Sequence, residues 1–105
     1  MSDDVGPVFA ALADANRRFM VEALLSEGTT TVPALTSALP ITRQAVAKHL
    51  AALGDAGLVE RAPGAGREVR YRLSDHALSP AAAWIGAAED AWEGRLARLK
   101  DAVER

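Results

Sequence analysis

The sequence contains no cysteine among its 105 residues. This absence excludes disulfides, thiolate metal ligands and thiol catalysis. The chain also has no apolar run near the ~20 residues that a helix needs to cross a bilayer, and no secretory signal opens it. We therefore expect a cytoplasmic protein that has no membrane partner.

Side chains suited to catalysis are scarce as well. Two histidines leave few candidates for a nucleophile–base pair. The sequence has neither a glycine-rich phosphate loop nor a His-Glu-X-X-His zinc motif, and its carboxylates are scattered without an isolated acid–base pair. We therefore expect no catalytic residues, no metal site and no cofactor, which argues against an enzyme.

What the chain does contain is alanine, in 23 positions, and a balance of half hydrophobic and one quarter charged residues. That composition fits one helical globular domain over residues 1–105. The net charge of −2 is unevenly distributed, because residues 43–72 carry +3 and the rest of the chain carries −5. Such local asymmetry points to an anionic partner for the basic segment, or to an ordinary solvated face.

Residues 31–57 are expected to form two helices joined by a short turn. Thr31 fits the N-cap of the first helix, and Pro40 ends it because proline disfavours helical geometry in the residue before it. Thr42 fits the N-cap of the second helix, and Gly57 fits its left-handed C-terminal residue. Apolar residues of this second helix recur at the spacing of one buried face, at Val46, Leu50 and Leu53. This arrangement is a helix-turn-helix.

The hydrophobic period then changes from 3.6 to 2, which indicates a β-hairpin over residues 58–73. Residues 58–61 are the first expected strand, residues 62–66 the turn, and residues 68–73 the second strand. A hairpin in this position is a wing. Further helices are expected near residues 5–13 and 14–28, and Ser79 and Pro80 should cap and begin a last helix. The expected fold is mainly α with a small β-hairpin, a winged helix-turn-helix.

The helix that begins after Thr42 has an outward face suited to DNA. Arg43 and Gln44 have the fork geometry to read base edges, and they stand at the helix end that enters the major groove in helix-turn-helix proteins. Lys48 lies on the same side, and outward alanines keep the helix slim. The alternative is an ordinary solvent-exposed face.

Arginines of the hairpin extend this basic surface. Arg67 and Arg70 are expected to contact phosphates, although alternating charges also protect an exposed strand from aggregation. His49 lies at the edge of the buried face of its helix. It could donate to a phosphate or fill the junction between helix and wing.

The last helix has an apolar stripe that one protomer does not need for its own core. Its counterpart is a stripe on the first helix. We therefore expect a two-fold homodimer through residues 1–13 and 79–105, which would match a palindromic double-stranded DNA site. The expected interface residues are Val8, Phe9, Leu12, Trp84, Trp92, Leu96 and Leu99.

Four ordered motifs resemble the ArsR family of winged-helix repressors. They are FAALADANRR at residues 9–18, LPITRQAVAKHL at 39–50, LGDAGLV at 53–59 and GREVRYRL at 66–73. The resemblance implies a homodimeric transcriptional regulator, usually a repressor that occludes a promoter. It also implies DNA contacts from Thr42, Arg43, Gln44, Lys48 and His49.

The sequence departs from the metal-sensing members of that family. Their cysteine pair is replaced by residues 35–38, read as LTSA, and of their last-helix ligands only Asp75 is matched. A single carboxylate cannot hold a transition metal. Residues 91–99 resemble the metal-free branch that is often encoded beside SRPBCC (START-like) proteins. Two alternatives stay open, namely a sensor with an unidentified small-molecule effector near the two tryptophans, and a protein-interaction module that does not bind DNA.

Overall fold

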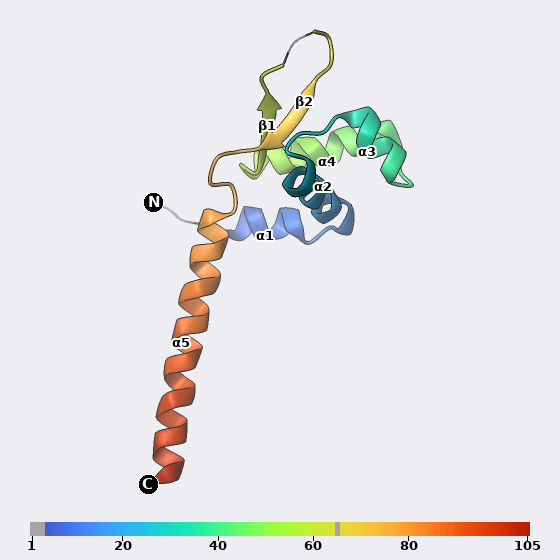
Figure 1. The fold of residues 1–105 in the computed structure, drawn as a ribbon. Helices are drawn as coiled ribbons and strands as arrows, with labels where there is room; N and C mark the ends of the chain where they lie inside the picture. The colour runs from blue at the N-terminus through green and yellow to red at the C-terminus, as the bar shows by residue number, and fades with distance from the viewer. Residues whose placement is uncertain (1–3, 65) are drawn as a thin grey trace.

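The computed structural model describes residues 4–64 and 66–105. Five helices and one hairpin follow one another along the chain, as the ribbon in Figure 1 shows. The elements are α1 Gly6–Leu12, α2 Ala15–Glu27, α3 Val32–Ala38, α4 Arg43–Asp55, β1 Val59–Ala62, β2 Arg70–Leu73 and α5 Ser79–Glu104. The expected fold class, mainly helical with a small hairpin after a helix-turn-helix, is confirmed.

Local side-chain chemistry sets the ends of the central helices. The hydroxyl of Thr31 accepts the backbone N–H of Ala34, and the hydroxyl of Thr42 accepts that of Ala45, each at 3.1 Å. Leu39 is extended (φ −121°, ψ 144°) because Pro40 follows it. The turn between α3 and α4 is therefore short and stiff, which fixes the angle between the two helices.

Helix α4 ends in the motif that Gly57 predicts. Gly57 has a φ of +80°, a conformation that glycine adopts without steric cost. The backbone N–H of Gly57 donates to Gly54, and that of Leu58 donates to Leu53 at 2.9 Å, the paired bonds of a Schellman motif. Leu58 is thereby turned back into the core, and β1 begins one residue later.

The wing is an antiparallel pair in which Val59 lies opposite Leu73 and Arg61 opposite Tyr71. Thr30, before α3, makes two further backbone bonds with Tyr71, at 3.1 and 2.9 Å. The hairpin is therefore attached directly to the helix pair. The second strand begins at Arg70, so the prediction that it includes Glu68 and Val69 was wrong. The first strand is shifted by one residue from the predicted 58–61. Ala65, within the predicted turn, lies outside the described residues.

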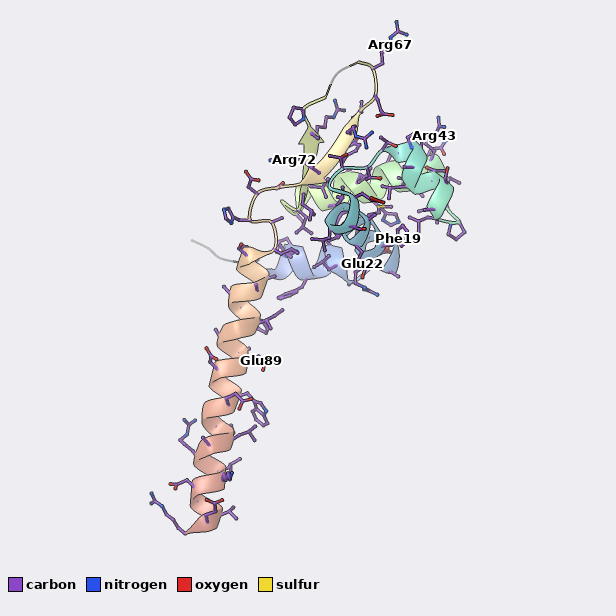
Figure 2. All side chains as sticks on the ribbon, viewed as in Figure 1. Phe19, Glu22, Arg43, Arg67, Arg72 and Glu89 are labelled. Atoms are coloured by element: carbon purple, nitrogen blue, oxygen red, sulfur yellow. The ribbon has the colours of Figure 1, made fainter. Side chains whose placement is uncertain are left out.

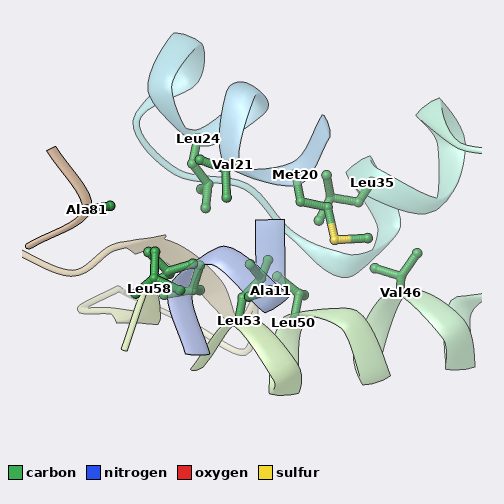
Figure 3. Close-up of a cluster of buried hydrophobic side chains, with 12 residues drawn as sticks. Ala11, Met20, Val21, Leu24, Leu35, Val46, Leu50, Leu53, Leu58 and Ala81 are labelled. Atoms are coloured by element: carbon green, nitrogen blue, oxygen red, sulfur yellow. The ribbon is translucent and has the colours of Figure 1, made fainter. Parts of the chain in front are cut away.

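The hydrophobic core lies between α1, α2, α3, α4 and β1, where the close-up in Figure 3 shows side chains from these elements converging. Its largest fully buried side chains are Met20, Leu35, Val46, Leu53 and Leu58. Each such side chain contributes about 1.5–3 kcal/mol when it leaves water. The core holds the helix-turn-helix in one rigid arrangement.

Helix α5 leaves this core after its first turn. Ala81 is buried, but the remainder of the helix projects away from the other elements (Figure 1). The molecule measures 68 × 30 × 22 Å, with a radius of gyration of 18.4 Å, whereas about 13 Å is usual for a compact chain of this length. Ser79 was expected to cap this helix, but Leu78 occupies the cap position without a side-chain bond and Ser79 is the first helical residue.

Candidate nucleic-acid interface

The outward face of α4 carries the residues predicted to contact DNA. Val46, Leu50 and Leu53 turn inward and are buried. Thr42, Arg43, Gln44, Ala47, Lys48 and Ala51 are all exposed. With the described residues, neither Arg43 nor Lys48 forms an ion pair. The N-terminal half of α4 therefore offers uncompensated positive charge and base-reading side chains on a slim surface.

The arginines of the wing divide into two kinds. Arg70 bonds to the Thr29 hydroxyl through Nε at 2.9 Å and pairs with Glu68, while Arg72 pairs with Glu60 at 2.9 Å and with Asp75 at 3.3 Å. Arg61 and Arg67 are exposed. Neither forms an ion pair with the part of the chain that the structure describes.

Position separates these side chains too. Figure 2 shows Arg67 at the outer end of the hairpin loop, pointing away from the helices, with α5 running away from it and from Arg43. The wing thus leaves Arg67 exposed at its outer end, whereas Arg70 anchors the wing to the α2–α3 loop. Arg61, which flanks the hairpin tip in the sequence and was a weaker candidate there, is exposed like Arg67.

His49 is half-buried at the edge of the core face of α4. Its Nδ1 lies 3.3 Å from the NH1 nitrogen of Arg17, at the start of α2. It therefore contacts α2. Both of its expected roles, as a phosphate contact and as a filler of the helix–wing junction, stay predictions.

Asp14 caps α2 close to this pair. The backbone N–H of Arg17 donates to its carboxylate and lowers the pKa of Asp14 below the ordinary value of 3.8. A bond from the N–H of Asn16 and the positive charges nearby act in the same direction, while desolvation opposes them. The carboxylate therefore stays ionised to lower pH than usual.

The predicted dimer residues also divide. Phe9 and Trp84 meet within the protomer in an edge-to-face contact, with ring centroids 5.6 Å apart. Trp84 and Trp92 are each 55% exposed, and Leu96 and Leu99 are also exposed. Val8 is buried in the core, so its inclusion in a partner surface was wrong; Leu12 is half-buried.

Possible metal ligands do not gather in the described ranges, 4–64 and 66–105. No group of three or more histidine, aspartate or glutamate side chains is placed to hold an ion there. Asp75, the one residue that matches the metal-sensing pattern, pairs with Arg72. Within the same ranges, no helix is long and apolar enough to span a membrane.

A helix pair with an exposed basic second helix, followed by an attached hairpin, defines a winged helix-turn-helix DNA-binding domain. Comparison with known proteins agrees. A family described as a helix-turn-helix domain matches residues 12–62. The HTH-type transcriptional regulator YuzN of Bacillus subtilis is 38% identical over 79 residues, which cover 70% of this chain and 82% of YuzN.

Solved structures give the family. An ArsR-like transcriptional regulator from Rhodococcus sp. RHA1 superposes with a TM-score of 0.82 at 38% identity, over 95% of this chain and 90% of that one. The homodimeric winged helix-turn-helix domain of Mb0332 from Mycobacterium bovis gives 0.63 at 30% identity, over 83% and 81%. The present chain belongs to the ArsR-like family and is a DNA-binding transcriptional regulator.

Proposed function

We propose that this regulator is a homodimeric repressor that needs no metal, and that it places α4 of each protomer in the major groove of a palindromic operator. The observation that carries the proposal is the exposed N-terminal half of α4, where Arg43, Gln44 and Lys48 have no acidic partner among residues 4–64 and 66–105. Arg43 and Gln44 read base edges. Thr42, Lys48, His49, Arg67 and Arg70 contact phosphates, and Arg70 also supports the wing through its bond to Thr29.

The dimer supplies the symmetry that a palindrome needs. The apolar stripe of α5 lies outside the core of its own protomer, and a second copy presents an identical stripe. Mb0332, a similar domain, is homodimeric. Two recognition helices in such a dimer would meet half-sites about 34 Å apart, one turn of duplex. Occupation of a promoter by the dimer would exclude RNA polymerase, which is the basis of repression.

The assignment is tested by selecting bound fragments from genomic DNA and then measuring affinity across single-base variants of the selected site. Arg43→Ala and Gln44→Ala should each lose about 1–3 kcal/mol of discrimination at one or two positions. Lys48→Ala should weaken binding to all variants alike. Arg98→Ala, which removes the same charge from an exposed position on α5, is the matched control. Unchanged discrimination in both Arg43→Ala and Gln44→Ala would refute base reading by α4.

Salt dependence gives an independent measure of the phosphate contacts. A dimer that neutralises about 6–10 phosphates loses roughly 10³–10⁵ in affinity between 50 and 200 mM salt. A flat salt dependence would favour a protein-interaction module, although the α4 face shows neither the apolar exposure nor the acidic charge expected of one.

A small-molecule effector is a second candidate feature, favoured by one pocket. It has a volume of about 400 Å³ and is lined by Val5, Pro80, Ala83 and Trp84, where α5 leaves the core. Ligand pockets usually measure roughly 300–1,000 Å³ and are mainly apolar. A thermal-shift screen with metals and small molecules tests this proposal, and Trp84→Ala should abolish any stabilisation that a true occupant produces.

A further inference from the structure

Arg17 joins the first helix to the recognition helix through a single guanidinium. Its Nε donates to the Ala11 carbonyl at 2.7 Å, and NH2 donates to the Ala10 carbonyl at 3.3 Å. Both carbonyls lie in the last turn of α1. The Ala10 carbonyl also accepts the backbone N–H of Ala13 at 3.2 Å. The third nitrogen, NH1, lies 3.3 Å from Nδ1 of His49 on α4. Arg17 thereby links the end of α1 to α4.

The chemistry of this contact determines where the proton of His49 resides. A guanidinium has only donors, so Nδ1 of His49 must accept. A neutral imidazole that accepts at Nδ1 carries its proton on Nε2. The contact therefore leaves Nε2–H as the one donor that the ring can offer to another group.

We propose that Arg17 is a positioning residue for DNA binding, which holds His49 in the Nε2–H form so that the ring donates to a DNA phosphate. This inference rests on the proposed function, which places His49 at the DNA. Arg17 is itself half-buried, and all three of its nitrogens have acceptors within the protein. Arg17 therefore acts through His49 and does not contact a DNA phosphate directly.

Arg18 provides a matched control. Its NH1 donates to the Leu12 carbonyl at 2.6 Å, which is the same end of α1, and its side chain is exposed. Arg18→Met removes a neighbouring positive charge and one bond to α1, and it leaves the Arg17–His49 contact in place. An effect of Arg17→Met that exceeds the effect of Arg18→Met reflects the second bond to α1 or the link to α4. The double variant with His49→Asn separates these two contributions.

The test compares the affinities of full-length variants for the selected operator. Losing one hydrogen bond to a charged group should weaken binding about tenfold, in Arg17→Met and in His49→Asn alike. The double variant should bind no more weakly than His49→Asn alone, because both changes remove the same phosphate contact. Arg17→Met should leave the slope of log K against log salt unchanged, whereas Lys48→Ala should reduce it by about 0.9 for each phosphate that is no longer neutralised.

Four outcomes would overturn the inference. They are additive effects in the double variant, a reduced salt slope in Arg17→Met, an equal loss of affinity in Arg18→Met, and a normal affinity in Arg17→Met. In each case the proposed function would still stand if Arg43→Ala relaxes base preference. If no α4 variant alters DNA binding, the proposed function itself fails.

A measurement on the unmodified protein keeps the inference testable if Arg17→Met does not fold. Long-range ¹H–¹⁵N spectra of the neutral imidazole distinguish a protonated Nε2 from a protonated Nδ1. We expect the His49 ring to show the Nε2–H form, with Nδ1 shifted as a hydrogen-bond acceptor. A proton on Nδ1 of His49 would contradict the proposed contact.

Discussion

The body of the protein, defined as residues 6–78, and helix α5 have similar apolar stripes. The stripes of the body are buried within the chain, whereas the stripe of α5 is exposed. In the body, Leu53 is completely buried by other elements of the same chain. In α5, Leu99 occurs in an equally regular stripe and is 52% exposed. An amphipathic pattern therefore predicts that one face of a helix is buried, but it does not indicate whether the same chain or a partner buries it.

This difference defines what a second copy must do. Exposed apolar patches of this kind mark interaction sites on soluble domains. The stripe continues from Ala81, which is in the core, down the whole projecting helix. Dimerisation through α5 would thus bury the α5 stripe of each protomer against the other copy, in continuity with the hydrophobic core.

The largest effect should come from placing a charge in the α5 stripe. Trp92→Glu adds a charge to each side of the proposed interface, so it should raise the dimer dissociation constant by more than about 100-fold. Sedimentation analysis should show monomers at concentrations where the unmodified protein is dimeric. Because a monomer presents only one recognition helix, operator affinity should fall as well.

Ala97→Glu is the control for this experiment. Ala97 is exposed on the opposite, charged side of α5, and the substitution keeps helix propensity high. It should leave the dimer intact. An intact dimer in Trp92→Glu would show that the stripe of α5 is not the interface, and the contrast between body and α5 would need another explanation.

The second-largest effect is expected when a leucine is replaced by alanine in the body and, separately, in α5. In the monomeric Trp92→Glu background, Leu53→Ala should lower the free energy of unfolding by about 2–5 kcal/mol, because it leaves a cavity in the core. Leu99→Ala in that background should change it by less than about 0.5 kcal/mol. Urea denaturation measures both. Equal losses would mean that α5 folds back onto the body in the monomer.

The smallest effect concerns the N-cap of α2. The pKa of Asp14 is lower in the folded chain than its ordinary value of 3.8, so the folded state binds fewer protons there than the unfolded state. Its contribution is complete at pH values above 3.8 and is lost as the pH falls through the lowered pKa. Asp14→Asn keeps the capping oxygen without the titration. The melting temperature of the unmodified protein should therefore fall more steeply with acid than that of Asp14→Asn.

Much of the fold could be predicted because its signals are local. Thr31, Thr42 and Gly57 act within a few residues of their own positions, so sequence spacing suffices to place the helix-turn-helix. The outward face of α4 follows from helical periodicity once Val46, Leu50 and Leu53 define the inward face. Cap chemistry and periodicity together gave the residues of the candidate DNA surface.

The features that the sequence could not reveal depend on contacts between distant segments. The pairing of Thr30 with Tyr71 joins residues that are separated by two helices and a strand. Cross-strand geometry brings Arg72 to Glu60, whereas Arg61 and Arg67 have no ion pair within the described residues. The link from Arg17 to His49 has only a weak local signal, which is a basic residue soon after the end of a helix.

The position of the aromatic side chains in α5 has a practical consequence. Both tryptophans of the chain, Trp84 and Trp92, lie on this helix, and each is about half exposed. Intrinsic fluorescence at the indole wavelength consequently arises from α5 alone, while the recognition helix is optically silent. Emission during dilution should follow subunit exchange without any label, and it should stay unaltered by substitutions that affect only the reading of bases.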